Sequence, residues 1–431
     1  MKKQLLINFL LLFFLISCKG QKQKDRNIET LNLVWETMNT KYFDSTFNGL
    51  NWQDEYNHYK PIIEKCETYD TIFHYLNEML FKLNVSHLFA LPPNYEDEIG
   101  SPQLFLDGTI GIDLRLINEE AIIISVKKNS VAYNSGIKVG YRILEVNGKT
   151  IKSFIEAKKT DPNPPYNDIH IYLLSTENII RELYGTPGDT IKITYVDEKN
   201  QEYHKRLELE NRSIEKVDFI PSLPPMYASI DKRVISDGIA YIHFDVFLPV
   251  VLDSIVSAIA EFHSYPNLII DIRGNPGGDF NTRRTIAEQF VSERTLFWKY
   301  QRRHDVNEVF LNPTTNPYMG NVVILIDELS SSSSEEFSGA MQAIERATVI
   351  GQRTAGKVLT MEIVQLPNGG LFVYPNQQTR TSKNDVLESV GVIPDIEVNW
   401  NKADLMNGID TQLEKAIEYL ENNKIPKTKE Q

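Results

Sequence analysis

Apolar residues recur along this chain at spacings that change from one region to the next. Between residues 27 and 91 they recur every three to four positions, as at Leu31 and Val34, which predicts amphipathic helices. From about residue 104 to 210, short β-branched runs separated by glycine turns predict strands. Beyond residue 238, strand-like and helix-like segments alternate. The chain is therefore predicted to have a helical front end, a β-rich middle and an α/β carboxyl-terminal part.

A run of five serines marks the most informative turn in the α/β part. Val322 to Ile326 is an apolar run that predicts a buried strand, and Ser330 to Ser334 precede a segment with helical spacing. A sharp strand-to-helix turn on small residues exposes a side chain beside free backbone N–H groups. This turn therefore fits a nucleophile, although a serine-rich N-cap on an ordinary α/β crossover would show the same pattern.

A glycine-rich loop follows an earlier strand of the same part. The run Leu268 to Ile272 predicts a strand, and the sequence RGNPGGD follows it at residues 273–279. The loop lacks the Gly-Lys-Ser/Thr of a Walker loop and the spacing of a dinucleotide loop. Its paired glycines are instead suited to presenting backbone N–H groups to a developing oxyanion.

The β-rich middle contains glycine turns at recurring places. The stretch Ser130 to Ile151 combines small-residue turns, an apolar strand and an Asn-Gly hairpin turn, and it closely resembles a PDZ domain. PDZ domains bind an extended peptide at a sheet edge, and here N–H groups near Gly111, Ile112 and Asp113 would receive its carboxylate. A PDZ-like fold with a plugged groove is the alternative.

The amino terminus has the pattern of a targeting segment. Two lysines precede an apolar stretch from Leu5 to Ile16, which is too short to span a membrane, and Ser17 and Cys18 follow. This end resembles a bacterial lipobox, which implies a lipid on Cys18, a polar tether at 19–26 and a cell-envelope location on the periplasmic side or outer membrane. A plain cleaved signal peptide is the alternative.

The net charge and the cysteine and histidine positions argue against a nucleic-acid partner, an internal disulfide and a metal site. The net charge of −13 argues against a nucleic-acid partner. Cys66 is the one cysteine besides Cys18, so a mature lipidated chain has no internal disulfide and no thiolate metal cluster. No His-x-x-x-His pair occurs either, so we expect no metal and no cofactor.

Four motifs follow one another in the α/β part: Asp271–Gly278, Ser332–Glu335, Thr354–Lys357 and Gly391–Asp395. In this order they resemble the tail-specific, or C-terminal-processing, serine peptidase family S41. In addition, Trp35, Tyr42–Asp44 and Ser86–His87 resemble the front end of the branch that includes the tricorn core. The resemblance implies an α/β fold with a crotonase-like (ClpP/crotonase) peptidase core, a helical N-terminal region and an inserted PDZ-like domain.

The resemblance also divides the chain into domains. The expected ranges are 1–18 for a lipoprotein signal peptide, 19–26 for a tether, 27–95 for the helical region, 104–212 for the PDZ-like domain, 213–231 for a linker and 232–425 for the peptidase core.

The family pattern Ser-x-Ser-Glu implies that Ser332 is the nucleophile. The amide of Ser333 and the turn at Gly277 and Gly278 would then hold the oxyanion. The alternative is a neighbouring serine of the run, since five adjacent serines make a shift of one residue in the assignment easy.

The group that activates the serine is left open between two solutions. Lys357 matches the lysine base of the Ser–Lys branch, but Val358–Thr360 departs from the pattern that follows it there. His87 and Glu388 match the His–Ser–Glu order of the tricorn-like branch, with Ser86 orienting the site. We favour His87 with Glu388. A structural histidine and a solvated loop carboxylate are the alternatives.

Together these features predict a lipid-anchored serine endopeptidase of the cell envelope. Its partners would be unfolded or C-terminally exposed polypeptides and the membrane, and the oligomeric state is not indicated. The rival hypothesis is a catalytically inactive PDZ-containing lipoprotein that binds peptides. Loss of a site residue would favour that rival, but Ser332, His87, Glu388 and Lys357 are all present.

Overall fold

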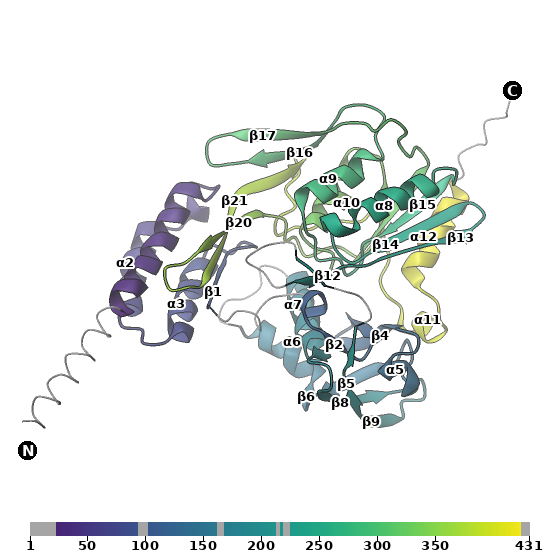
Figure 1. The fold of residues 1–431 in the computed structure, drawn as a ribbon, viewed down its shortest axis with the longest axis horizontal. Helices are drawn as coiled ribbons and strands as arrows, with labels where there is room; N and C mark the ends of the chain where they lie inside the picture. Colours follow the sequence, from purple (N-terminus) through teal and green to yellow (C-terminus); the bar gives the residue numbers. More distant parts are fainter. Residues whose placement is uncertain (1–22, 94–101, 162–167, 213–215, 219–224, 424–431) are drawn as a thin grey trace, which may run out of the picture. The chain divides into compact units, whose positions relative to one another are not determined.

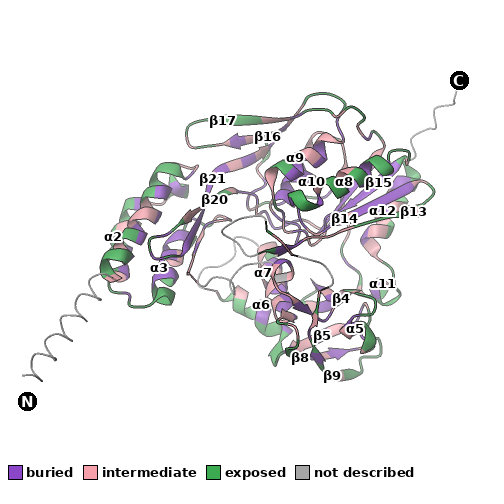
Figure 2. Ribbon diagram, viewed as in Figure 1, coloured by how far each residue is buried: buried purple, intermediate pink, exposed green. Residues whose placement is uncertain are grey.

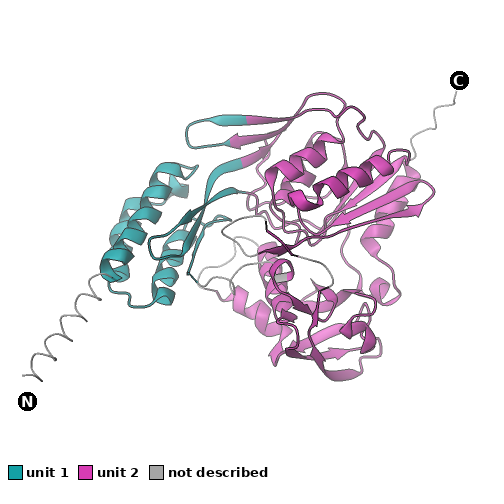
Figure 3. Ribbon diagram, viewed as in Figure 1, with its two compact units in different colours: residues 1–99, 301–307, 359–378 teal, residues 100–300, 308–358, 379–431 magenta. Residues whose placement is uncertain are grey.

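The computed structural model drawn in Figure 1 describes residues 23–93, 102–161, 168–212, 216–218 and 225–423. It divides into two units, coloured separately in Figure 3. Unit 1 comprises residues 1–99, 301–307 and 359–378, and unit 2 comprises residues 100–300, 308–358 and 379–431. The hairpin strands β16 (Thr295–Gln301) and β17 (Val306–Leu311) have residues in both units.

Unit 1 contains the predicted helical front end. Its helices bury aromatic and aliphatic side chains such as Leu31, Val34 and Trp52 in one core, together with Phe372 and Tyr374 from a small sheet. Capping side chains fix two helix starts, because Asn51 and Thr68 accept backbone N–H groups of the first turns. The elements are helical residues 23–41, η1 (Phe47–Gly49), α2 (Trp52–Ile63), α3 (Tyr69–Phe81), β1 (Phe89–Leu91), β20 (Thr360–Gln365) and β21 (Leu371–Thr381), in which β21 pairs with both other strands.

Unit 2 begins with the PDZ-like domain. Its main sheet has the order β3-β4-β5-β8-β9, with β6 paired to β5, so β3 is an edge strand. Inward-facing residues such as Ile112, Leu114 and Ile143 form a separate apolar core with the helices. The elements are α4 (Pro102–Phe105), β2 (Gly108–Thr109), β3 (Ile112–Ile117), β4 (Glu120–Val126), α5 (Val131–Asn134), β5 (Arg142–Val146), β6 (Lys149–Thr150), α6 (Ile151–Lys159), α7 (Asp168–Arg181), β7 (Tyr184–Gly185), β8 (Thr190–Val196), β9 (Glu202–Glu208) and β10 (Glu210–Asn211).

The rest of unit 2 is an α/β core built on a six-stranded sheet of order β13-β14-β15-β18-β19-β22. β13 is antiparallel to β14, and the other neighbours are parallel. Parallel strands of this kind are covered on both faces and are apolar throughout. The elements are β13 (Ile230–Ser236), β14 (Ile239–Phe244), α8 (Pro249–Glu261), β15 (Asn267–Asp271), α9 (Phe280–Glu288), β18 (Asn321–Ile326), α10 (Ser333–Ala343), β19 (Thr348–Gly351), β22 (Ile396–Glu397), α11 (Lys402–Met406) and α12 (Thr411–Asn422).

Side chains along each strand point alternately to the two faces of this sheet, and each face packs against a different set of helices. Ala240 and Ile242 join the core that contains α8, α9 and α10, whereas Tyr241 joins the cluster that contains α12. The central strands are accordingly buried along their length in Figure 2. The register pairs Asp271 of β15 with Leu325 of β18, so the loops that follow both strands emerge at the same edge of the sheet.

Three predicted boundaries differ from the structure. The sequence pattern predicts a helix over Thr285 to Val291, and in the structure it starts earlier, at Phe280, because Asp279 caps it by accepting the Thr282 N–H. The last helix, predicted from the apolar spacing at about Gly408 to Leu420, is α12, and a short helix that was not predicted, α11, precedes it and ends before Gly408, whose φ is +76°. The stretch predicted as a linker contains the short antiparallel strands β11 (Lys216–Val217) and β12 (Met226–Tyr227) as well as the start of β13.

Some predictions fall on residues that the structure does not describe. They include the signal peptide with Cys18, most of the tether, and most of the proline-rich segments at 161–166 and 221–225. Within the described ranges, no helix combines the length and the hydropathy needed to cross a bilayer.

Candidate active site

The five serines lie where β18 turns into α10. Ser332 is the N-cap of α10 and has φ +54° and ψ −118°, a backbone conformation that a non-glycine residue rarely adopts. Its N–H donates to the carbonyl of Lys357 at 2.9 Å and to Glu335 Oε2 at 3.1 Å. The surrounding hydrogen bonds therefore hold a strained residue at the turn, as is common at functional sites.

The hydroxyls of the other four serines form structural hydrogen bonds. They donate to backbone carbonyls of the glycine-rich loop that follows β15, so the loop and the serine turn form one rigid piece. Ser332 is not one of these donors, and its half-buried side chain does not bond the loop in the described structure. The four bonds are Ser330 to Ile272 at 2.8 Å, Ser331 to Pro276 at 3.1 Å, Ser333 to Gly278 at 2.8 Å and Ser334 to Asn275 at 2.8 Å.

Two glycines bring the loop into contact with this turn. Gly277 has φ +105° and Gly278 has φ +136°. A Cβ on Gly277 would lie 2.7 Å from the Cβ of Ser332, and a Cβ on Gly278 would overlap the carbonyl oxygen of Phe247. Any larger residue would therefore push the loop away from Ser332.

The available oxyanion donors differ from the prediction at Gly277. Its N–H already donates to Asn275 Oδ1 at 2.9 Å, so it cannot face a substrate oxygen in this conformation. The carbonyl of Gly277 accepts from the Phe247 N–H at 2.7 Å, which directs the Gly278 N–H of the same trans peptide to the opposite side. We therefore keep the N–H groups of Gly278 and Ser333 as the predicted oxyanion donors, the latter at the start of α10, where N–H groups lack helical partners.

Glu335 ties the serine turn to the Thr354–Lys357 segment. Its Oε2 accepts the N–H groups of Ser332 and Lys357, and its Oε1 accepts the Gly356 N–H and the Thr354 hydroxyl. Burial raises the pKa of Glu335, and these hydrogen bonds act against that rise. Sequence reasoning gave Glu335 no role of its own, although its place three residues after a serine N-cap is the capping-box spacing that signals one.

Lys357 and Glu388 lie close to this turn, as predicted. The Val358 N–H, next to Lys357, donates to Glu388 Oε2 at 3.1 Å, and Glu388 is 8% exposed. Lys357 is half-buried and forms no ion pair with any described residue. The backbone therefore brings Ser332, Lys357 and Glu388 together within unit 2.

Ser86 and His87 belong to unit 1. They follow α3 and precede β1, and His87 has φ +55°. The Ser86 hydroxyl and His87 Nδ1 are 2.8 Å apart, a contact that is consistent with the orienting role predicted for Ser86. His87 lies in one unit and Ser332 and Glu388 in the other. The choice of His87 or Lys357 as base therefore stays a prediction.

The loop predicted to take a peptide carboxylate leads into β3. Gly111 has φ +79°, and its N–H donates to Thr109 Oγ1. Asp113, which is partly exposed, binds Arg115 with both oxygens at 2.9 Å and accepts the Leu114 N–H. A carboxylate entering this loop would therefore meet a local acidic group that is already neutralised by a guanidinium.

Arg115 also joins the PDZ-like domain to the α/β core. Its Nε donates to Asp327 Oδ2 at 2.8 Å, and both side chains are almost fully buried. Asp327 Oδ1 accepts the N–H groups of Gly274 and Leu329, which lie in the two loops of the site. Sequence reasoning missed this pair, because 212 positions separate its members and neither belongs to a local pattern.

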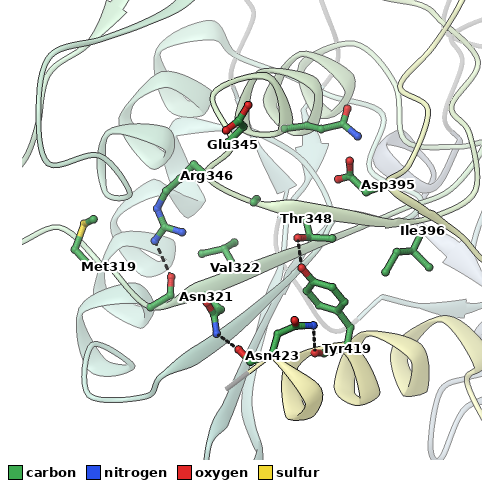
Figure 4. A pocket seen from close by; sticks show the side chains of 13 residues that line it. Met319, Asn321, Val322, Glu345, Arg346, Thr348, Asp395, Ile396, Tyr419 and Asn423 are labelled. Carbon is green, nitrogen blue, oxygen red and sulfur yellow. Dashed lines mark hydrogen bonds between the residues drawn. The ribbon is translucent and has the colours of Figure 1, made fainter. Parts of the chain in front are cut away.

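A cavity of about 570 Å³ lies at the other end of the sheet. Figure 4 shows it at the start of β18 and β19, near Asn321, Thr348 and Tyr419, whereas the serine turn follows the carboxyl end of β18. The cavity is therefore separate from the serine turn, which carries the predicted nucleophile. Among the described residues, no group of three or more His, Cys, Asp or Glu side chains is arranged to hold a metal ion.

Several charged side chains contact one another where β14 and β15 end. Although burial opposes its charged form, the guanidinium of Arg273 holds the pKa of Asp271 far below its usual range. Burial also opposes the charge on His243, but the carboxylates of Asp245 and Asp271 raise its pKa to about 9. His243 Nε2 lies 3.2 Å from Asp245 Oδ1, and its Nδ1 lies 3.0 Å from the Asp271 carbonyl. His243 is therefore a structural cation rather than a base.

Three family models match the chain. The model described as peptidase family S41 matches residues 238–398, the tricorn protease C1 domain matches residues 29–81, and the PDZ domain matches residues 103–171. A carboxyl-terminal-processing protease of Synechocystis sp. is 25% identical over 404 residues, which cover 90% of this chain and 85% of that protein. Tricorn protease homolog 1 of Streptomyces coelicolor is 24% identical over 404 residues, 88% of this chain and 34% of that protein.

Solved structures share the fold. The photosystem II D1 C-terminal processing protease superposes with a TM-score of 0.56 at 17% identity, covering 91% of this chain and 96% of that one. Mature CPAF superposes with a TM-score of 0.62 at 13% identity, covering 92% and 96%. The predicted fold class, an α/β peptidase core with a PDZ-like domain and a helical front end, is confirmed.

The charge of His243 predicts a pH dependence of stability. Its folded pKa of about 9 exceeds the unfolded value of about 6.5, so its stabilising contribution is complete below pH 6.5 and is lost as the pH rises through 9. We expect the thermal midpoint of the wild type to fall between pH 6.5 and 9.5 more steeply than that of His243→Gln. His204→Gln, which changes an exposed histidine on β9, should keep the wild-type slope. Parallel curves for wild type and His243→Gln would contradict the assignment.

Proposed function

Since the chain is a serine-type peptidase whose residues 238–398 belong to peptidase family S41, we propose that it cleaves unfolded or C-terminally exposed polypeptides with Ser332 as nucleophile. The names of its relatives, which include carboxyl-terminal-processing proteases, support this substrate class. The rival hypothesis of an inactive peptide-binding lipoprotein finds no support in the comparisons.

One observation favours Ser332 over its neighbours. Four of the five serine hydroxyls are committed to carbonyls of the glycine-rich loop, and the remaining one, on Ser332, belongs to the residue with the strained turn conformation. A nucleophile must be free to leave its resting contacts and attack, whereas a structural hydroxyl must not. The geometry therefore supports the register that the motif implied.

In the proposed reaction, Ser332 Oγ attacks the substrate carbonyl carbon while a base takes the hydroxyl proton. The tetrahedral oxyanion accepts hydrogen bonds from the N–H groups of Gly278 and Ser333. The protonated base then gives the proton to the leaving amine, and an acyl-enzyme on Ser332 remains. Water, deprotonated by the same base, attacks the ester, and the base returns that proton to Ser332 Oγ as the C–O bond breaks and the new carboxyl terminus is released.

Removing the nucleophile tests this assignment. Ser332→Ala should lower the hydrolysis of an unfolded protein substrate by at least about 10³-fold, because the covalent step is lost. The matched control is Ser331→Ala, which removes the neighbouring hydroxyl and one loop contact but should retain most of the activity. Both are measured in the chain that lacks residues 1–18. Retained cleavage in Ser332→Ala, or loss only in Ser331→Ala, would move the nucleophile.

We further propose His87 as the base, supported by Glu388. The match of residues 29–81 to the tricorn C1 domain and the contact between Ser86 and His87 both favour this choice. Serine-bound Nδ1 would hold the ring in one orientation, which a general base requires. Lys357 would then be a positioning residue, whose backbone N–H and carbonyl bond Glu335 and Ser332.

Two substitutions distinguish the bases. His87→Ala should abolish hydrolysis of the same substrate, whereas Lys357→Met, which keeps the backbone bonds and removes the ammonium, should leave most of the activity. The expected loss for His87→Ala is about 10³-fold or more. The reverse pattern, with His87→Ala active and Lys357→Met inactive, would establish a Ser–Lys enzyme. Circular dichroism spectra of both variants control for folding.

We propose that the PDZ-like domain captures the substrate. Its edge strand β3 has one partner strand in its sheet, and the loop at Gly111, Ile112 and Asp113 leads into it. A peptide end would pair along such an edge, with its carboxylate at this loop but not on the Gly111 N–H, which already donates to Thr109 Oγ1. In this proposal the domain holds the chain end while a more distant peptide bond reaches Ser332.

For location, we propose that a lipid on Cys18 anchors the protein to the cell envelope, as the lipobox-like sequence suggests. In cells fed a radiolabelled fatty acid, the wild type should be labelled and found in the membrane fraction, and Cys18→Ala should be unlabelled. Cys66→Ala, which changes the buried cysteine, is the matched control and should be labelled. Equal labelling of Cys18→Ala and wild type would contradict the anchor.

A further inference from the structure

A buried ion pair lies directly behind the proposed oxyanion donors. Arg283, in the first turns of α9, pairs with Glu336 of α10, and their side chains are 2% and 5% exposed. The pair joins the two helices that begin at the glycine-rich loop and at the serine turn. Neither residue belongs to the motifs that predicted the site, and the reaction proposed above leaves both without a role.

The guanidinium of Arg283 bridges three groups. Its Nη1 donates to the Ser333 hydroxyl at 3.1 Å and also meets Glu336, while its Nη2 donates to the Tyr300 hydroxyl at 2.8 Å. Glu336 Oε1 accepts the Thr379 hydroxyl at 2.6 Å. The Nε of Arg283 has no hydrogen-bond partner among the described residues. Keeping a charged group buried with one unpaired donor is costly, so the arrangement calls for an explanation.

The contact to Ser333 leads to the oxyanion donors. Because Arg283 donates to the Ser333 oxygen, the hydroxyl proton of Ser333 is directed to its other partner, the Gly278 carbonyl at 2.8 Å. Gly278 and Ser333 are the two residues whose N–H groups would hold the oxyanion. The relay from Arg283 through Ser333 to Gly278 therefore fixes the spacing of these two donors.

Loss of the contact between Arg283 and Ser333 would let the proposed oxyanion donors move. Without Arg283, the Ser333 hydroxyl could rotate, and the Gly278 peptide would lose the bond that holds its carbonyl against α10. Both donors lie on short segments whose geometry depends on this cross-link, since Gly278 has a backbone conformation open to glycine alone. Oxyanion donors stabilise the transition state only when their N–H groups are preorganised.

We propose that Arg283 and Glu336 are positioning residues that set the oxyanion hole by fixing the Ser333 hydroxyl against the Gly278 carbonyl. This inference rests on the proposed role of Ser332. It assigns to the pair an effect on the tetrahedral state and not on substrate binding. A lysine at position 283 could carry the charge but could not reach Ser333, Glu336 and Tyr300 together.

The test compares variants that separate positioning from folding. Arg283→Lys keeps the charge, and the double variant Arg283→Met with Glu336→Met removes both charges, so that no unpaired ion is buried. Tyr300→Phe is the matched control, because it removes the partner of Arg283 Nη2 and leaves the Nη1 contact to Ser333 in place. Each is measured for thermal midpoint, for kcat and KM on a fluorogenic peptide, and for the rate at which a fluorophosphonate labels Ser332.

We expect kcat and the labelling rate to fall about 10- to 100-fold in Arg283→Lys and in the double variant, with KM within about twofold of wild type. The double variant should keep a thermal midpoint near that of the wild type, and Tyr300→Phe should keep its kcat. A double variant with wild-type kcat and labelling would overturn the inference, as would a change confined to KM. If the fluorophosphonate does not label Ser332 in the wild type, the proposed function fails instead.

Discussion

The hydrogen bonds between the serine turn and the glycine-rich loop are the constraint on which the site depends. Four hydroxyls donate to carbonyls of the loop and hold it against the start of α10, and these four bonds are here called the clamp. The contact is possible because Gly277 has no Cβ to collide with Ser332. The same bonds leave the hydroxyl of Ser332 outside the clamp and bring the Gly278 N–H to the side where an oxyanion would form.

Other parts of unit 2 support this clamp from different directions. Glu335 binds the serine turn to the segment that ends at Lys357, and Asp327 binds the glycine-rich loop while pairing with Arg115 of the PDZ-like domain. Behind them, Arg283 and Glu336 join α9 to α10. Buried carboxylates and guanidinium groups thus connect elements that are far apart in sequence, and a buried pair of this kind contributes specificity of arrangement more than net stability.

Sequence alone predicted the layers and the strand-to-helix turn on serines, because periodicity and glycine placement are local signals, whereas the choice of Ser332 within that turn came from the family resemblance and stays a prediction. The strands β14, β15 and β18 and the turn that carries Ser332 fall where the pattern indicated. The start of α9 was missed, because Asp279 acts as a cap inside what reads as a loop. The engagement of the Gly277 N–H by Asn275 and the pair of Arg115 with Asp327 depend on tertiary contacts that no local pattern encodes.

The most direct test of the account is to locate the serine that an active-site reagent modifies. The chain without residues 1–18 is treated with a fluorophosphonate, digested, and sequenced by fragmentation mass spectrometry across Ser330–Ser334. Modification of Ser332 alone is the predicted result, since it has the hydroxyl that is outside the clamp. Modification of Ser331 or Ser333, or an even spread over the five serines, would contradict the central claim.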